Sequence, residues 1–177
     1  MSWKTLAILL FMLIMVSGVN SALLADPIWF PSRVTNGSLE QWANDKPVGW
    51  RKTGLITTTQ FDPFLGQYSV RVRNFQPWHD YLYQDITYSG GSFLFGCAHR
   101  STGWLVGGEI TIVYLDSMGQ EISRRYWYCY PGDWQIILTI LGPPEETATI
   151  SIRLVPIEDD SGDVIVDHVF MIPLGGM

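Results

Sequence analysis

Hydrophobic and polar residues alternate with a period of two along most of the chain. The clearest run covers residues 147–155, where Ala148, Ile150, Ile152 and Leu154 occupy every second position between polar residues. Successive side chains of a β-strand point to opposite faces, so this pattern predicts a strand with one buried face. Similar alternation predicts further strands at residues 68–74, 81–88, 92–99, 109–116, 121–130, 134–141 and 164–172.

Short segments rich in glycine, proline and aspartate separate the predicted strands, for example Ser89-Gly90-Gly91, Pro131-Gly132-Asp133 and Gly142-Pro143-Pro144. Glycine adopts positive φ angles without steric cost and proline fixes φ, which suits both to tight reversals. Beyond the N-terminus, no stretch of a dozen residues has apolar positions at a helical period, so crossover helices are not expected. The sequence therefore predicts an all-β fold, an antiparallel two-sheet β-sandwich.

The first 25 residues have a different pattern. Lys4 precedes an unbroken apolar run over residues 6–16, and a weakly polar stretch follows. This layout is typical of a secretory signal peptide, in which Val19 and Ser21 would precede a cleavage site at Ala22. If the segment is kept instead, its roughly 20 residues, rising about 1.5 Å each, are long enough to cross a hydrocarbon core of about 30 Å.

Both interpretations of this segment export the rest of the chain. A kept segment is a single transmembrane anchor with its N-terminus in the cytoplasm, because Lys4 is the only charge before Asp26. The folded part is therefore expected to be periplasmic or extracellular, either secreted or anchored to the membrane. The expected organisation is an N-terminal apolar helix over residues 1–25, a linker over 26–35 and a β-sandwich over 36–177.

The composition argues against a nucleic-acid partner. The net charge is −6, and adjacent basic residues occur only at Arg51-Lys52 and Arg124-Arg125. Binding to nucleic acid depends on neutralising phosphates, so an acidic chain without a basic cluster is not suited to it. Beyond the N-terminal segment, roughly 150 residues remain, which is the usual length of one domain with one core.

Two cysteines, Cys97 and Cys129, lie in aromatic, strand-like segments, and an exported protein can form a disulfide between them. Closing a loop of about 30 residues would stabilise the fold by roughly 3 to 4 kcal/mol in the chain-entropy model. The alternative is that both are separate buried thiols that pack as small hydrophobic side chains. Neither cysteine has a second cysteine or a histidine at the spacing of a metal site.

Several motifs together resemble a known family. The segment 36–42 (Asn-Gly-Ser-Leu-Glu-Gln-Trp), followed by Pro47-Val48-Gly49-Trp50, resembles the opening of carbohydrate-binding modules with the galactose-binding-like jelly-roll fold. Residues 66–72, 83–86, 112–119 and 164–169, together with Trp134, resemble later strands of the same family in the expected order. The resemblance covers nearly the whole exported part. It implies a jelly-roll sandwich that binds a polysaccharide or glycan without catalysis.

The resemblance also implies a metal site. Modules of this family often hold a structural Ca²⁺ near the first and last strands, and Glu40 and Asp167 match the acidic positions there. Carboxylates suit a hard cation that takes six to eight oxygen ligands. The alternative is that Glu40 is a charge at a strand end and Asp167 a hydrogen-bonding residue.

The family binds sugars on aromatic platforms, and this chain contains eight tryptophans. We expect ligand contacts from two aromatic clusters and one arginine, namely Trp78, Tyr81, Arg100, Tyr126 and Tyr128. The alternative is that these aromatic residues are core or interface residues and that the arginine pairs with a surface acid.

The strand predicted at 121–130 leaves one question open. Alternation puts Tyr126, Tyr128 and Tyr130 on one face, and Trp127 and Cys129 on the other. Tryptophan and cysteine suit burial, but tyrosines can also line a core with their hydroxyls at its edge. Trp42 and Trp50 are expected in the core.

No catalytic motif is recognisable. The histidines His79, His99 and His168 are far apart in sequence and do not form a metal-binding spacing. His168 lies in the closing strand on the side of Val166 and Phe170, where a partly buried imidazole is expected. We expect a binding protein rather than an enzyme.

The sequence leaves more than one function open. The first is an exported binding module of the carbohydrate-binding kind. The second is a membrane-anchored accessory subunit that packs its sandwich on the outer face of a membrane protein complex, since aromatic residues and arginine are enriched at protein interfaces. A component of a virion or cell surface is a third.

Overall fold

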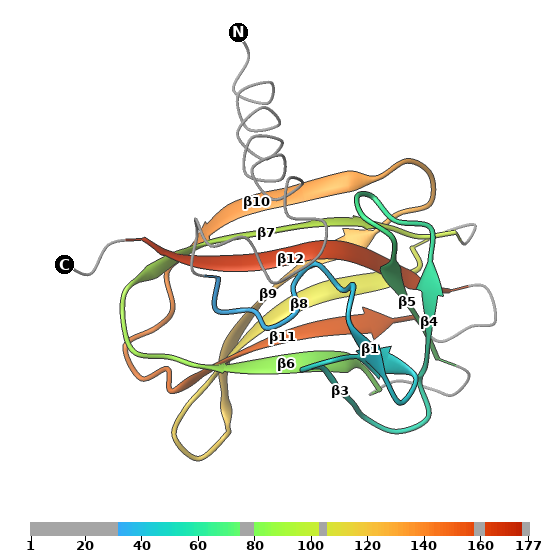
Figure 1. Cartoon of the computed structure of the whole chain (residues 1–177). Coiled ribbons are helices and arrows are strands. Elements are labelled where there is room, and N and C mark those ends of the chain that lie inside the picture. Colours follow the sequence, from blue (N-terminus) through green and yellow to red (C-terminus); the bar gives the residue numbers. More distant parts are fainter. Residues whose placement is uncertain (1–31, 75–79, 103–105, 158–161, 175–177) are drawn as a thin grey trace, which may run out of the picture.

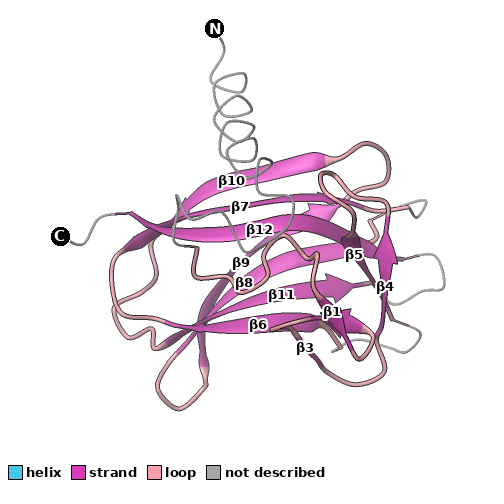
Figure 2. Cartoon of the chain, viewed as in Figure 1, coloured by secondary structure: helices cyan, strands magenta, loops and turns pink. Residues whose placement is uncertain are grey.

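The computed structural model describes residues 32–74, 80–102, 106–157 and 162–174, which form two five-stranded antiparallel sheets stacked as a sandwich (Figure 1). Sheet 1 has the strand order β10-β7-β12-β5-β4, sheet 2 has the order β3-β6-β11-β8-β9, and β1 and β2 form a small hairpin. The strands are β1 (Trp42–Ala43), β2 (Lys46–Pro47), β3 (Arg51–Lys52), β4 (Thr57–Phe61), β5 (Ser69–Arg73), β6 (Leu82–Thr87), β7 (Ser92–Arg100), β8 (Gly108–Leu115), β9 (Glu121–Cys129), β10 (Gln135–Leu141), β11 (Thr149–Pro156) and β12 (Val164–Leu174). Within these ranges every regular element is a strand, which confirms the predicted fold class (Figure 2).

The core lies between the two sheets and is formed by alternate residues of the long strands. Ile110 and Ile112 of β8 and Ile150 and Ile152 of β11 are fully buried in it. Trp50 is also fully buried in this core, whereas Trp42 is partly exposed and packs against the core from its edge. Burying one face of every strand is the arrangement that two-residue alternation predicts.

All eight strands predicted from alternation are present, with ends within two residues of the prediction. The prediction missed β4, an edge strand of sheet 1, because its Thr-Thr-Thr-Gln-Phe sequence has few apolar side chains. An edge strand hydrogen-bonds on one side only and buries less, so its hydrophobic signal is weaker. The two-residue strands β1, β2 and β3 are too short to produce a periodic signal.

A β-bulge corrects the expected orientation of His168. The register of β12 against β7 shifts between Asp167 and Phe170, and His168 has a φ of 50°. The extra residue places Val166 in the core between the sheets and Phe170 in a second apolar cluster on the opposite face. The two residues are therefore not on the same side, because a bulge reverses the alternation beyond it.

The sandwich begins earlier than predicted. Arg33 donates its N–H to the Met171 carbonyl at 2.8 Å, and Thr35 donates its N–H to Gln84 Oε1 at 2.7 Å. Residues 32–35 are thus part of the domain rather than of a linker. The predicted N-terminal helix and the rest of the linker lie outside the described residues. Within the described part, no helix has the length and apolar character needed to cross a membrane.

Candidate functional site

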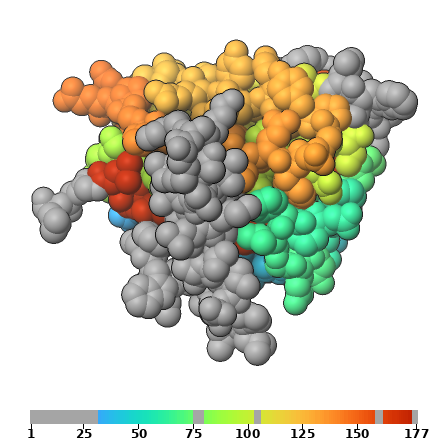
Figure 3. Space-filling model, turned by 90° about the horizontal axis from the view of Figure 1, so that it is seen from above, coloured from blue at the N-terminus to red at the C-terminus, as the bar shows by residue number. Residues whose placement is uncertain are grey.

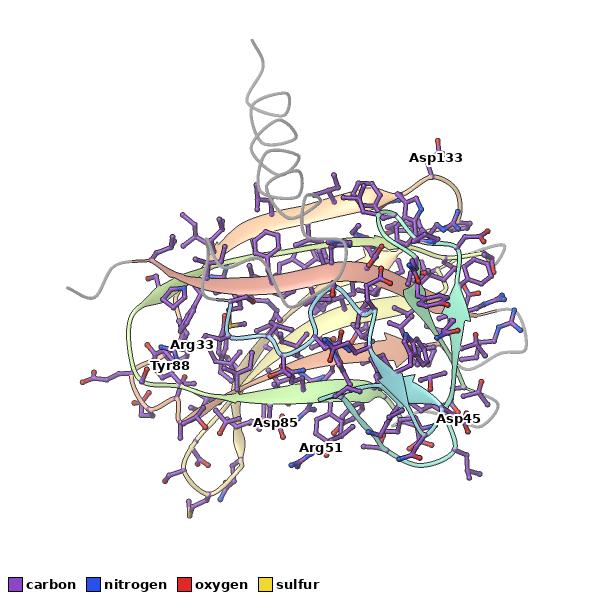
Figure 4. The ribbon with its side chains drawn as sticks, in the orientation of Figure 1. Arg33, Asp45, Arg51, Asp85, Tyr88 and Asp133 are labelled. Carbon is purple, nitrogen blue, oxygen red and sulfur yellow. The ribbon has the colours of Figure 1, made fainter. Side chains whose placement is uncertain are left out.

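Polar and aromatic side chains gather on the outer face of sheet 2. The strand registers place one row of residues directly opposite one another across all five strands. From β9 to β3 this row is Tyr126, Thr111, Arg153, Tyr83 and Arg51. Arg51 points away from the sandwich (Figure 4). We call this surface the tyrosine face.

Tyrosines stand at two sides of this face. Along β9, Tyr126, Tyr128 and Tyr130 are 52%, 43% and 48% exposed, and the ring centroids of neighbours are 5.3 and 6.3 Å apart. At the β6 side, the rings of Tyr81 and Tyr83 are 5.4 Å apart. Three interstrand intervals of about 4.8 Å separate β6 from β9, so the two groups of rings are about 14 Å apart. This spacing leaves room for an extended ligand between them.

Smaller polar side chains form the floor between the tyrosines. Thr111 and Ser151 are buried although they point outward, so the floor is recessed below the rings at its sides. Thr111 Oγ1 donates to Glu109 Oε1 at 2.8 Å, and Arg153 Nε donates to Ser151 Oγ at 3.2 Å. The Arg153 guanidinium also lies 4.7 Å from the centre of the Tyr81 ring. The floor therefore presents the Arg153 guanidinium and the Glu109 carboxylate, each held by a buried hydroxyl beneath it.

The Tyr128 hydroxyl is a neutral hydrogen-bonding group of this face. The neighbouring Tyr126 raises the pKa of Tyr128 above its ordinary value, with smaller contributions from desolvation. Tyr128 therefore stays protonated near neutral pH and can both donate and accept.

The structure brings together three of the five predicted ligand residues, Tyr81, Tyr126 and Tyr128, on the tyrosine face. Arg100 belongs to β7 in the other sheet, where its guanidinium lies 4.8 Å from the centre of the Trp134 ring and 5.6 Å from that of Phe61. It is therefore not part of the tyrosine face. The sequence could not show this, because the neighbours of a strand in sequence do not indicate which sheet it joins. Trp78 lies outside the described residues.

The sequence prediction missed Tyr83, and it missed Glu109, Thr111 and Arg153, which lie between the two groups of tyrosines. Alternation alone places Tyr83 on the same side as Tyr81. The remaining three could be found only with the order and register of the strands, which bring separate segments into one row.

The structure shows which face of β9 is buried. Trp127 and Cys129 point into the sandwich, and the Trp127 ring stacks on Phe95 with centroids 6.0 Å apart. The three tyrosines point to solvent. Cys97 and Cys129 are both buried free thiols, which corresponds to the second interpretation of the cysteines. Burial raises the pKa of both, so both stay protonated.

The two predicted metal ligands meet at one loop, between β4 and β5. Glu40 Oε1 accepts N–H groups from Gln67 and Tyr68 at 2.8 and 3.3 Å. Asp167 is fully buried, and its Oδ2 accepts the N–H groups of Phe64 and Leu65 at 2.9 and 3.1 Å.

This geometry is that of a clamp on backbone N–H groups. A bound cation would need the carboxylate oxygens that accept these backbone N–H groups. Glu40 and Asp167, as arranged here, therefore do not fit Ca²⁺. Among the described residues, no three His, Cys, Asp or Glu side chains form a group that could hold a metal. Calcium binding stays a prediction of the resemblance alone.

No family model and no curated protein matches this sequence. Solved structures share its fold. The CBM22-1 xylan-binding domain from Paenibacillus barcinonensis Xyn10C has a TM-score of 0.57 and 9% identity, covering 73% of this chain and 88% of that domain. TmCBM61 in complex with β-1,4-galactotriose has a TM-score of 0.56 and 18% identity, covering 81% of this chain and 99% of that one.

A larger protein is similar too. The enzymatically active domain of tailspike protein 4 from bacteriophage CBA120 has a TM-score of 0.60 and 16% identity, over 81% of this chain and 21% of that chain. This chain thus spans about a fifth of that one. Identities this low show the fold alone, and the fold is the galactose-binding-like jelly roll of carbohydrate-binding modules.

Proposed function

We propose that this chain is an exported, non-catalytic carbohydrate-binding module whose glycan ligand lies across the tyrosine face. The observation that carries the proposal is the row from Tyr126 to Arg51, in which the exposed Tyr126 and the half-buried Tyr83 flank a recessed polar floor. The C–H faces of a pyranose ring pack on tyrosine, and its hydroxyls pair with a guanidinium, a carboxylate or another hydroxyl. The similar structures include a xylan-binding domain and a complex with β-1,4-galactotriose, which supports a glycan as the ligand class.

The expected affinity is modest. Two ring contacts and three hydrogen bonds, at about 1 kcal/mol net each, give about 5 kcal/mol in total. Since a Kd of 1 mM corresponds to about 4.1 kcal/mol, this sum predicts a Kd of about 0.2 mM. Multivalent presentation along a polysaccharide would raise the apparent affinity well above this value.

Isothermal titration calorimetry with xylohexaose and with β-1,4-galactotriose tests the proposal. Tyr126→Ala removes a ring at the rim of the face, and Arg153→Ala removes the guanidinium of the floor. Each is expected to weaken binding about tenfold, the equivalent of about 1.4 kcal/mol. Met118→Ala is the matched control, because this exposed residue lies in the β8–β9 turn and outside the face. Equal binding by wild type and both variants would contradict the proposed site.

A second candidate function, a membrane-anchored accessory subunit, is supported by a different surface. The outer face of sheet 1 is apolar, with Ile140 60% exposed and Leu174 39% exposed. An antiparallel sheet usually has one polar face, so an apolar outer face favours contact with another surface. The other apolar residues there are Phe64, Leu65, Leu94, Ala98, Trp134, Ile136, Leu138, Phe170 and Ile172.

N-terminal sequencing of the native protein separates the two candidates. A start at Ala22 would mean that the leader is removed, which excludes the anchored subunit and agrees with a secreted module. A start at Met1, together with retention in the membrane pellet after alkaline washing, would support the anchored subunit.

A further inference from the structure

A cavity of about 530 Å³ opens where the edge strand of one sheet lies beside the edge strand of the other. These strands are β9 and β10, coloured yellow-orange and orange in the view from above (Figure 3). Arg125 Nη1 of β9 donates to the Ile140 carbonyl of β10 at 3.4 Å, so one side chain links the two edges. The cavity lies within the range of about 300–1,000 Å³ that is usual for small-molecule sites.

Two polar side chains of the edge strand β10 line this cavity. Gln135 and Thr139 of β10 share the inward face with Ile137, because they pair with His99 and Phe95 of β7, which point inward. Inward positions between two sheets are normally apolar. At this sheet edge, the exposed Gln135 and the half-buried Thr139 lie two positions before and two positions after Ile137, and both line the cavity.

His99 lines the cavity and is the one described lining residue with a buried polar atom left unpaired. It is 3% exposed, and its Nδ1 has no hydrogen-bond partner among the described residues. Leaving such an atom unpaired is unfavourable, and buried polar atoms in native structures usually have a protein, water or ligand partner. Gln84 is also polar and inward, but it is fully used, since it bonds to the backbone of Thr35 and Gly49.

The lining selects a neutral ligand. Among the described residues, it consists of aromatic, aliphatic, amide, hydroxyl and imidazole groups, without an acidic or a basic side chain other than His99. Burial lowers the pKa of His99 to about 4, so the imidazole is neutral at physiological pH. Trp127, Tyr128 and Tyr130 supply the aromatic wall. Rings beside uncharged donors and acceptors suit a neutral sugar better than an anion.

Tyr128 lines the cavity and also stands on the tyrosine face, so the two surfaces meet at β9. We infer that the cavity is an additional subsite, which takes one neutral sugar unit of a glycan that crosses over β9 from the tyrosine face. This inference rests on the proposed function, because it extends the same ligand beyond the platform. A short oligosaccharide would occupy the platform alone, and a longer one would reach both.

Titrations of xylotriose and xylohexaose into the full chain test the subsite. Thr139→Phe fills the cavity, and Gln135→Leu removes an amide with little change in volume. Each is expected to weaken xylohexaose binding about tenfold and to leave xylotriose binding within about twofold. Ile140→Ala is the matched control, because it lies on the same strand but on the outer face. Tyr126→Ala should weaken both oligosaccharides.

The outcomes separate the two proposals. If Tyr126→Ala weakens binding while Thr139→Phe and Gln135→Leu leave both affinities unchanged, the platform stands and the subsite is wrong. If the wild type binds neither oligosaccharide, the proposed function fails and the subsite with it. Should the filling variant fail to fold, the His99 imidazole ¹⁵N signals of the wild type decide. They are expected to shift with xylohexaose and not with xylotriose, and unchanged signals would overturn the subsite.

Discussion

Asp163, at the start of β12, offers the sharpest test of how this sandwich is held together. Its carboxylate is fully buried and accepts hydrogen bonds from Arg71 Nε at 2.6 Å and from Ser101 Oγ at 3.0 Å. The N–H and the hydroxyl of Thr102 donate to it at 2.7 and 2.6 Å. One side chain thus ties β5 and the end of β7 to β12.

Asp163→Asn removes the charge and turns one acceptor oxygen into a donor that faces other donors. Breaking a buried, hydrogen-bonded ion pair from one side costs about 3–5 kcal/mol. Arg71 is 18% exposed and keeps some hydration, so we expect the lower half of this range. For a domain of this size, about 3 kcal/mol lowers Tm by roughly 10 °C.

The assay is urea unfolding of wild type and variant, followed by tryptophan fluorescence at pH 7. Asp133→Asn is the matched control, since Asp133 projects from the turn before β10 (Figure 4). An exposed substitution of this kind changes stability by about 0.5 kcal/mol or less. If Asp163→Asn lowers the free energy of unfolding by less than about 1 kcal/mol, the carboxylate does not stabilise the fold as argued. The loss of even one hydrogen bond to a charged group should cost more than this.

The same carboxylate predicts a pH dependence. Burial alone would raise its pKa, but the hydrogen bonds from Thr102 and the charge of Arg71 outweigh burial, and the pKa is lowered below 3.8. A group with a depressed folded pKa contributes stability that is complete above its unfolded pKa. Its contribution is therefore expected to disappear as pH falls from about 4 through the folded pKa. The difference in unfolding free energy between wild type and Asp163→Asn should shrink over this interval.

Three further predictions concern the cysteines, the loop clamp and the bulge. Burial and raised thiol pKa values predict that Cys97 and Cys129 react with a maleimide only after unfolding, and unfolded protein that takes up no label would reveal a disulfide. Glu40→Gln weakens two backbone hydrogen bonds and should lower stability by about 1 kcal/mol in urea. His168→Val puts a β-branched residue at a φ of 50° and should cost about 1–2 kcal/mol, whereas His168→Gly should be close to neutral, as comparison of their Tm values will show.

The long strands were predictable because each buries one face against the opposite sheet, which leaves a two-residue signal in the sequence. The residues of β11 show this most clearly, since Ile150, Ile152 and Leu154 all enter the core. This two-residue signal is weak in an edge strand, and it is interrupted at a β-bulge. An edge strand such as β4 has little to bury, and the inserted His168 reverses the alternation of β12 within a continuous hydrophobic run.

The candidate site was predictable only in part, since a binding face is a property of strand order. Tyr126 and Tyr128 stand out as aromatic residues on one side of one strand. Their association with Thr111 and Arg153 depends on β8 and β11 being the next strands in the sheet. The separation of Arg100 from the tyrosines was not predictable for the same reason, because nothing within β7 shows that the tyrosines belong to the other sheet.

The two outer faces of the sandwich differ in a way that bears on both candidate functions. The outer face of sheet 2 is aromatic and polar, whereas that of sheet 1 carries a second apolar cluster. Gly96 contributes to this cluster because the Phe170 ring lies where its Cβ would be. Since the two faces are on opposite sides of the molecule, a surface that covered sheet 1 would leave the tyrosines accessible. Loss of glycan binding in Tyr126→Ala and burial of Ile140 in an assembly are therefore compatible results, and neither one argues against the other.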